Sequence, residues 1–298
     1  MGDFVADTDV EYRECAEGMG SRYRAVLSPS WDVWGPLGGY LAAIAMRALG
    51  AASELPRPAS FQCLFLSVAS FGEVQLEVVS LRRGRRSQAL AVSMAQEGRP
   101  ILTAWGWTVA AGLPGLEHAH GAMPAVPPPA ALRSFSELAE DFGSWSPVWR
   151  GIEGRPHVWS AAPAPPLWHC WMRLVETPDL SDPFLEAART LLWLDLMMWN
   201  AAARPHLPWP PAYVAPNLDL AANFHAAAPS EEWLLCDAAA PVGRDGLLGC
   251  NGRVWSPDGR LVASGTSTLF CRPSDVVEPQ RARRYPEPDD PCSASGSR

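Results

Sequence analysis

Asp195 is the residue with the clearest chemical potential, because it interrupts the apolar run L-L-W-L-D-L-M-M-W at 191–199. A charge in such surroundings is costly unless it is paired or hydrogen-bonded. Burial would also raise the pKa of the carboxyl toward a range useful for taking a proton from water. The plainer interpretation is one polar residue on the solvent side of a helix. Apolar neighbours on every side favour a carboxylate general base that faces a cleft.

A second candidate is the glycine pair Gly38 and Gly39, at the start of a helix predicted over Gly38–Leu49. The first N–H groups of a helix have no acceptor within it, and the helix dipole favours negative charge there. These amides are therefore candidates to stabilise an oxyanion. Paired glycines can equally serve close packing of a helix on a sheet. Tyr40 follows directly as a candidate substrate-binding residue, and Asp32 is expected to be a turn or cap residue.

Other patterns exclude several classes of site. His118 and His120 lie in a loop without partners at ligand spacing, so we expect no metal site. The sequence has no G-x-S-x-G, no G-x-G-x-x-G and no Walker motif, and we expect no cofactor. The seven cysteines form an odd set without C-x-x-C, which favours neither a disulfide framework nor a zinc ribbon. A reducing cytoplasm is the simplest location.

Composition sets the limits on fold and partners. The chain has 298 residues, of which 48% are hydrophobic and 19% charged, so it can bury a sizeable core. The net charge of -8 argues against a nucleic-acid partner, which needs a basic face. Charged or polar residues interrupt the longest apolar runs, 36–52 and 191–203, and we expect no membrane span.

The elements that position these residues occur in the same order twice. Each half shows one strand, one long helix and four further strands. In the first half the expected elements are Ser21–Leu27, Gly38–Leu49, Phe61–Val68, Val74–Arg82, Ser87–Gln96 and Pro100–Val109. In the second half they are Leu167–Val175, Asp182–Ala203, Leu218–His225, Glu232–Ala239, Leu247–Trp255 and Leu261–Cys271.

The two halves align at a spacing of about 160 residues, since Q-E-G-R-P-I at 96–101 matches S-P-D-G-R-L at 256–261. A curved antiparallel sheet wrapped around a helix buries the apolar sides of that helix, as in the hotdog fold. We therefore predict an α+β double hotdog. Its expected parts are an N-terminal unit (1–125), a Pro/Trp-rich connection (126–166, irregular or partly helical), a C-terminal unit (167–272) and a flexible tail (273–298).

The sequence resembles the double-hotdog acyl-CoA thioesterases. In the first half the similarity lies in G-G-Y-L-A-A-I-A-M-R-A after Trp34, V-S-L-R-R-G-R-R-S at 79–87 and Q-E-G-R at 96–99. In the second half it lies in L-D-L-A-A-N-F-H at 218–225, E-E-W-L-L-C-D at 231–237 and S-P-D-G-R-L-V-A-S at 256–264. The resemblance covers roughly residues 20–110 and 167–272.

The resemblance also implies a catalytic set. Family members hold the nucleophilic water with an Asp on the second-half helix, a Thr at the start of the following strand and a Gln on the last strand. These positions fall on Asp195, Asn217 and Ser267, so the Asp is retained while the Thr and Gln are replaced. Asn can still hydrogen-bond a water, whereas Ser is shorter than Gln.

The function that the resemblance implies is hydrolysis of an acyl thioester of coenzyme A or of an acyl carrier protein. The two substitutions keep alternatives open: a dehydratase, isomerase or cyclase acting on a carrier-bound intermediate, or an acyl-binding module without turnover. The arginines of the turn at 82–86 either form a solvated face or contact phosphates of coenzyme A. Two fused units supply the pairing for which single hotdogs dimerise, so a monomer and a homo-oligomer both fit.

Overall fold

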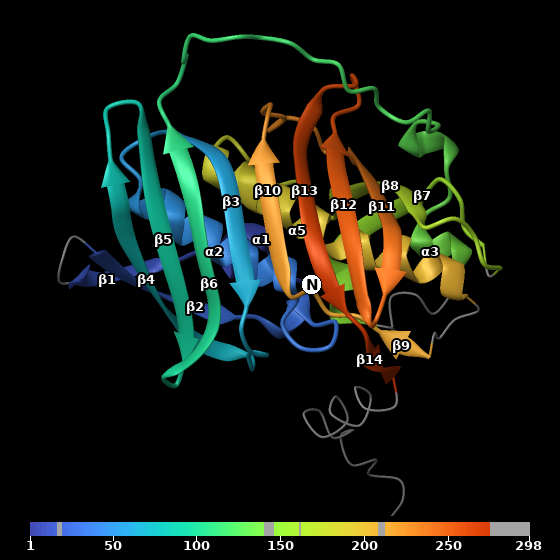
Figure 1. Ribbon diagram of the computed structural model, residues 1–298, viewed down its shortest axis with the longest axis horizontal. Helices are drawn as coiled ribbons and strands as arrows, with labels where there is room; N and C mark the ends of the chain where they lie inside the picture. The colour runs from blue at the N-terminus through green and yellow to red at the C-terminus, as the bar shows by residue number, and fades with distance from the viewer. Residues whose placement is uncertain (17–19, 140–145, 161, 208–211, 275–298) are drawn as a thin grey trace, which may run out of the picture.

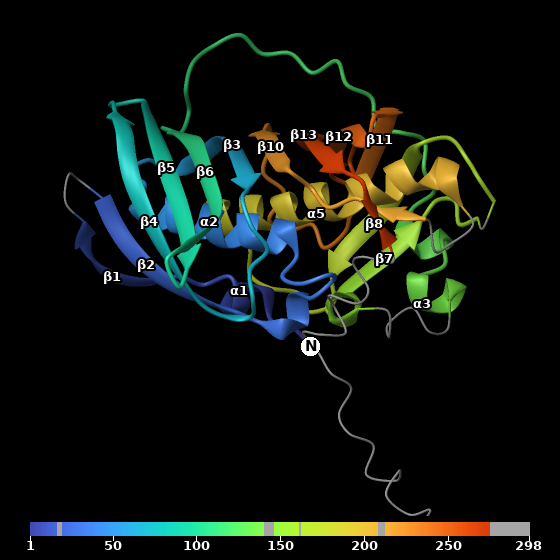
Figure 2. The same ribbon diagram turned by 60° about the horizontal axis from the view of Figure 1, so that its bottom comes forward.

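The structure, a computed structural model, describes residues 1–16, 20–139, 146–160, 162–207 and 212–274. Its main feature is one twelve-stranded sheet with the order β1-β2-β4-β5-β6-β3-β10-β13-β12-β11-β8-β7. This sheet curves around two long helices, α2 (Gly38–Ala52) and α5 (Pro183–Ala203), as Figures 1 and 2 show. The α+β double-hotdog prediction is thereby confirmed.

Each half of the sheet comes from one half of the chain. The N-terminal strands, in sheet order, are β1 (Glu11–Ala16), β2 (Gly20–Leu27), β4 (Gly72–Arg83), β5 (Ser87–Gln96), β6 (Arg99–Val109) and β3 (Arg57–Phe65). The C-terminal strands are β10 (Asp219–Phe224), β13 (Leu261–Phe270), β12 (Leu247–Trp255), β11 (Leu234–Arg244), β8 (Leu167–Leu174) and β7 (Ile152–Pro156). The short remaining elements are α1 (Phe4–Asp7), α3 (Phe135–Leu138), β9 (Tyr213–Val214), β14 (Arg272–Pro273) and four single-turn 3-10 helices at 29–31, 129–131, 147–150 and 204–206.

The two halves meet at β3 and β10, which pair antiparallel from Asp219 opposite Leu64 to Asn223 opposite Ser60. This pairing makes one continuous sheet out of two units. The long helices pack against each other beneath it, and nearly all of α5 is buried. A helix that is apolar all round is the sequence signature of such an element, with a sheet on one side and another helix on the other.

Local signals explain where α5 begins. Asp182 caps the helix, since its side chain accepts a hydrogen bond of 2.9 Å from the Phe184 N–H. Pro183 takes the first helical position, where its missing N–H is not needed. The predicted helix from Asp182–Pro183 to Ala203 is confirmed.

Two predicted strands are displaced, for physical reasons. β3 begins at Arg57 and ends at Phe65, whereas the apolar run predicted Phe61–Val68. Its start was missed because Arg57, Pro58 and Ser60 are polar or proline, and a register irregularity lies between Pro58 and Ser60. β11 begins at Leu234 and continues to Arg244, beyond the predicted end at Ala239. Pro241 lies in the register irregularity between Ala239 and Val242, a place where a strand tolerates proline.

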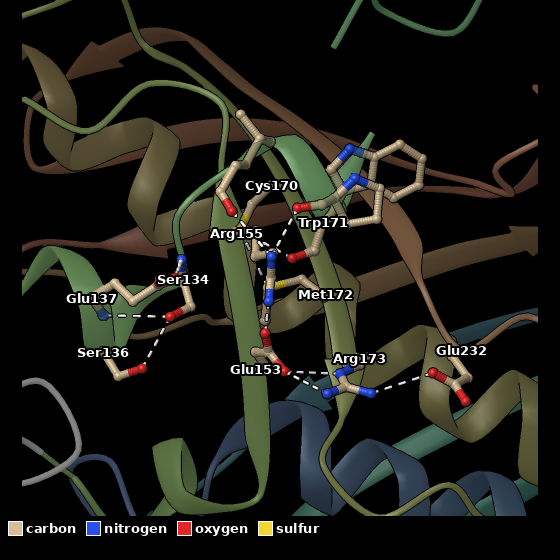
Figure 3. Close-up of polar contacts among 12 residues, drawn as sticks. Ser134, Ser136, Glu137, Glu153, Arg155, Cys170, Trp171, Met172, Arg173 and Glu232 are labelled. Atoms are coloured by element: carbon tan, nitrogen blue, oxygen red, sulfur yellow. Dashed lines mark hydrogen bonds and ion pairs between the residues drawn. The ribbon is translucent and has the colours of Figure 1, made fainter. Parts of the chain in front are cut away.

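The connection between the halves also departs from the sequence prediction, because it supplies β7, which pairs with β8 at the edge of the sheet. Ion pairs hold it there: Glu153 accepts from both Arg155 and Arg173, and Arg173 also contacts Glu232 (Figure 3). Arg155 further donates to the backbone carbonyls of Pro129 and Leu132. The proline-rich segment is therefore tied to the sheet edge by side chains.

The remaining predictions concern the chain end and membrane spans. Pro273, the first residue of the predicted tail, pairs with Tyr213 as part of β14, and the rest of that tail lies outside the described residues from 275 onward. Within the described part of the chain, no helix has the length and apolar character needed to cross a membrane.

Candidate active site

Asp195 on α5 lies directly against the first turn of α2. A Cβ atom on Gly38 would stand 2.8 Å from Oδ1 of Asp195, and one on Gly39 would stand 2.8 Å from its Cβ. Only glycine at both positions lets the two helices approach this closely. The glycine pair predicted from sequence and the predicted carboxylate are therefore neighbours in space.

Two donors orient the Asp195 carboxylate. The backbone N–H of Gly39 hydrogen-bonds to it, and Nδ2 of Asn217 donates to Oδ1 over 2.6 Å. Both hydrogen bonds favour the ionised form, but burial outweighs them and raises the pKa of Asp195 to about 6. The carboxylate is thus mostly ionised at neutral pH and remains a competent proton acceptor.

Asn217 owes its position to the start of β10. It forms an isolated bridge with Leu269 of β13. The N–H of Leu218 donates to the carbonyl of Thr268 over 2.8 Å, and the N–H of Thr268 donates to the carboxylate of Asp219 over 2.9 Å. These contacts fix the backbone around Asn217 and direct its amide toward α5.

Ser267 is buried on β13, and its hydroxyl donates to the backbone carbonyl of Asp219 over 2.6 Å. It follows Gly265 by two residues and so shares the face of β13 on which Gly265 meets Leu194 of α5. Within the described chain, the donors to Asp195 are Gly39 and Asn217. The structure thus brings Asn217 into contact with Asp195 and uses the Ser267 proton within the sheet.

The Tyr40 side chain supports the loop before α2. Its hydroxyl donates to the carbonyl of Asp7 over 2.7 Å and accepts from the N–H of Ser28. Its ring is fully buried and stacks on Trp31, with 5.4 Å between ring centroids and 14° between ring planes. These contacts do not involve Asp195, so the side chain acts on the loop rather than at the carboxylate.

The structure adds an aromatic pair that sequence reasoning did not single out as a site feature. The rings of Trp34 and Trp199 meet edge to face, with centroids 6.2 Å apart and planes at 73°. Trp199 follows Asp195 by four residues and therefore lies one turn further along the same side of α5. That spacing is the signal from which the place of Trp199 near Asp195 was predictable.

Two other side chains complete the apolar surroundings. Phe65, at the end of β3, has its ring edge 3.1 Å from the position that a Cβ on Gly38 would take. The Cys63 thiol on the same strand is buried, and burial together with the charge of Asp195 raises its pKa well above the usual range. The carboxylate is therefore enclosed by groups that remain neutral.

The arginine turn lies away from this site. Ser87 and Arg57 both pair with Val109, which places the turn at the end of the sheet where β3 begins. The eight steps from Arg57 to Phe65 correspond to about 26 Å along an extended strand. Arg83 pairs with Glu54 at 2.8 Å, in keeping with a solvated face. A contact between these arginines and a ligand at Asp195 of the same chain has no support in this geometry.

No group of three or more His, Cys, Asp and Glu residues in the described part of the chain is arranged to hold a metal ion. The Asp195 site itself offers the chemistry of a buried carboxylate beside a helix N-terminus. Such a pairing places a base close to donors suited to an oxyanion.

The duplicated strand–helix–sheet unit, with one carboxylate between its two helices, defines the class as a double-hotdog protein. Family models agree with this class in both halves. The acyl-CoA thioesterase N-terminal domain matches residues 27–109, and the acyl-CoA thioesterase C-terminal domain matches residues 120–270. The chain belongs to the acyl-CoA thioesterase family, as the sequence resemblance implied.

Solved structures show the same fold. A putative thioesterase II from Thermobifida fusca is 22% identical, with a TM-score of 0.75, over 91% of this chain and 98% of that one. Acyl-CoA thioesterase II TesB2 from Mycobacterium marinum is also 22% identical, with a TM-score of 0.73, over 91% and 97%. A bifunctional dehydratase-cyclase domain of ambruticin biosynthesis is more distant, at 17% identity and a TM-score of 0.51 over 92% and 98%. No curated protein matches the chain.

Proposed function

We propose that this protein hydrolyses acyl-CoA thioesters with Asp195 as the general base. The observation that supports this most is the buried carboxylate with a pKa of about 6, held between Gly39 and Asn217. A general base works best when its pKa is close to the working pH. Membership of the acyl-CoA thioesterase family supplies the substrate class.

In the proposed reaction, Asp195 takes a proton from a water whose oxygen attacks the thioester carbonyl carbon. Asn217 orients this water, with Ser267 in a supporting part. The carbonyl oxygen becomes an oxyanion that the first-turn N–H groups of α2 stabilise. Because the N–H of Gly39 already donates to Asp195, Gly38 is the principal donor in this role. The carbon–sulfur bond then breaks, and the thiolate leaves with the proton from Asp195 as free coenzyme A.

The test is a panel of acyl-CoA substrates spanning chain lengths, with the released thiol measured by a colorimetric reagent. We expect the wild-type protein to release coenzyme A and Asp195→Asn to lose this activity while remaining folded. If no substrate in the panel is hydrolysed, or if Asp195→Asn leaves the rate unchanged, the proposed hydrolysis is wrong.

A second candidate is a tailoring reaction, such as dehydration or cyclisation, on a carrier-bound intermediate. It is favoured by one observation: the Ser267 hydroxyl is engaged with the Asp219 carbonyl instead of with Asp195. The dehydratase-cyclase fold likeness fits it as well. Product mass separates the two reactions, because hydrolysis adds water across the thioester and releases the thiol, whereas a tailoring step keeps the acyl group attached.

A further inference from the structure

The site has a narrow side that faces solvent. From Phe184 to Ala203, every residue of α5 is buried except Trp199 and Asn200. On α2, residues 39–46 are all buried, and partial exposure begins at Gly38 and in the loop just before it. This loop and the last turns of α5 therefore form one partly exposed side of the Asp195 site, and Phe65 and Asn217 form another. The Trp34–Trp199 contact lies on that side.

The loop that holds Trp34 is preorganised. The side chain of Asp32 accepts a hydrogen bond of 2.8 Å from the N–H of Gly35, and Asp32 also bridges Pro36. Gly35 has a φ of 125°, a conformation that other residues rarely adopt. A turn closed in this way fixes the backbone at Trp34, whose ring contacts Trp199.

The base of the same loop is anchored as well. The Trp31 indole N–H donates to the Asp7 carboxylate over 2.9 Å, and the ring stacks on Tyr40. The N–H of Leu37 donates to the carbonyl of Trp31 over 3.0 Å. Trp34 is thus fixed from both ends of its loop, and an edge-to-face contact adds to this by holding Trp199 against it.

We propose that Trp34 and Trp199 form the entrance to the Asp195 site and determine which acyl groups are admitted. This rests on the proposed thioesterase function. With the ring centroids 6.2 Å apart the two indoles are in contact, so on this side a thioester reaches the carboxylate only when one ring moves aside. Straight acyl chains pass with a small displacement, and branched or aryl groups require a larger one.

The experiment compares butanoyl-CoA, 2-methylpropanoyl-CoA and benzoyl-CoA as substrates of wild type, Trp34→Ala and Trp199→Ala. We expect kcat/KM for the branched and aryl substrates, relative to butanoyl-CoA, to rise by roughly 10-fold or more in either variant. A change of this size is what one or two carbon atoms of pocket space produce. Trp34→Phe and Trp199→Phe keep a ring and should give intermediate ratios, and they replace the alanine variants if those do not fold.

The matched control is Trp107→Ala. Trp107 is a partly exposed tryptophan on β6, beside Arg82 and opposite Ser60, away from the α2 N-terminus. Its removal should leave all three ratios unchanged. Ratios that stay the same in both Trp34 and Trp199 variants, or that change equally in Trp107→Ala, would overturn the entrance proposal.

A binding measurement separates this proposal from the hydrolytic function. Thioether analogues of the butanoyl and benzoyl substrates, in which a methylene replaces the carbonyl, are titrated into Asp195→Asn with and without Trp199→Ala. If the wild-type protein hydrolyses no substrate but Trp199→Ala still changes the ratio of the two Kd values, the hydrolytic function is wrong and the entrance proposal is supported. Hydrolysis with an unchanged Kd ratio contradicts the entrance alone, and no binding of either analogue contradicts both.

Discussion

The two ends of the helix pair are built on one plan, yet in the described part of the chain a carboxylate lies against a glycine of α2 at only one of them. Gly106 on β6 and Gly265 on β13 mark the equivalence. A Cβ on either would collide with a carbonyl of the neighbouring strand and with a helix leucine, namely Leu49 on α2 or Leu194 on α5. Leu49 and Leu194 are therefore counterparts, and so are the residues that follow them, Gly50 and Asp195.

At each end, a glycine of α2 makes room for a residue of α5, but the α5 residue differs. At the site, Gly39 gives room for Asp195. At the opposite end, Gly50 gives room for Phe184, whose ring atoms lie where a Cβ on Gly50 would stand. One end thus combines glycines with a carboxylate, and the other combines a glycine with an aromatic ring.

The two ends therefore differ in how they contribute to the stability of the fold. Burying a phenylalanine contributes about 1.5–3 kcal/mol to folding. Burying Asp195 works against folding, because a rise in its pKa from 3.8 to about 6 corresponds to about 3 kcal/mol at neutral pH. The end with Phe184 therefore stabilises the fold, and the end with Asp195 sacrifices stability for a reactive group.

The largest expected effect comes from Asp195→Asn. Loss of the general base should lower kcat by roughly 10³-fold. The neutral amide can still accept from Gly39 and Asn217, so the fold is kept. The folded protein binds a proton at Asp195 more tightly than the unfolded chain does, and the contribution of Asp195 to the free energy of unfolding therefore falls as pH rises from about 4 to about 6. Asp195→Asn should lack this fall and should have the higher Tm at pH 7.

Thermal unfolding at pH 4, 5, 6 and 7 checks the stability part, and thiol release checks the activity part. The matched control is Phe184→Leu, which should lower the Tm and leave kcat within about twofold. A lower Tm for Asp195→Asn at pH 7 would show that the carboxylate stabilises the fold, and the contrast between the two ends would fail.

Alanine at the glycines gives the next largest effect. In Gly38→Ala the new Cβ would stand 2.8 Å from Oδ1 of Asp195 and push the carboxylate away, so kcat should fall by roughly 10²-fold. In Gly50→Ala the new Cβ collides with Phe184, which should lower stability by about 1–3 kcal/mol and leave kcat unchanged. Urea unfolding and thiol release on both variants separate the outcomes. Equal losses of activity would mean that the two ends are coupled.

Much of the fold was predictable because both units follow strict local rules. The β5 and β12 boundaries agree with the sequence, since alternating apolar residues and clear turns delimit both strands. β7 was not predictable, because the residues that hold it, Glu153 and Arg173, act through contacts across strands. The prolines around β7 predict an irregular segment, and a strand forms there only because of its tertiary contacts.

The site was predictable in part, for the same reason. A lone carboxylate in an apolar helix and a glycine pair at a helix start are local signals, and each indicated chemistry by itself. Their meeting is not local, because it depends on how α2 and α5 cross. Nor did the sequence distinguish the hydroxyl of Tyr40, bound to the Asp7 carbonyl, from one that faces a substrate.

Asn217→Ala should have a smaller effect, visible mainly in the pH dependence. The Asn217 amide lowers the pKa of Asp195, so its removal raises that pKa above about 6. The acidic limb of the kcat/KM profile, expected near pH 6 in the wild type, should move to higher pH. A residual loss of roughly 10-fold at pH 8 would report the positioning of the water. The profile is measured from pH 4.5 to 9, with Asn200→Ala, a partly exposed site on α5, as control.

An unmoved limb in Asn217→Ala would show that the titrating group is not the Asp195 that this amide contacts. A shift to lower pH would have the wrong sign for loss of a donor to a carboxylate. A limb that moves upward while the rate at pH 8 stays at the wild-type value would assign Asn217 to tuning the base rather than to holding water.

The smallest effect is expected for Ser267→Ala. Ser267 and Thr108 are counterparts, since each follows the equivalent glycine by two residues. Each hydroxyl is hydrogen-bonded inside the fold: Ser267 donates to the Asp219 carbonyl, and Thr108 accepts from the Ser53 hydroxyl. Loss of either hydrogen bond should cost about 1 kcal/mol in the free energy of unfolding. Only Ser267→Ala should also change kcat, by a few-fold, because Ser267 lies on β13, the strand with which Asn217 forms its bridge. Urea unfolding and steady-state rates of Ser267→Ala and Thr108→Val measure this difference. A 100-fold loss of kcat in Ser267→Ala would show that this hydroxyl is an essential hydrogen-bond partner of the water. If Ser267→Ala and Thr108→Val behave identically, the catalytic difference between the two ends is limited to Asp195, Asn217 and the glycines.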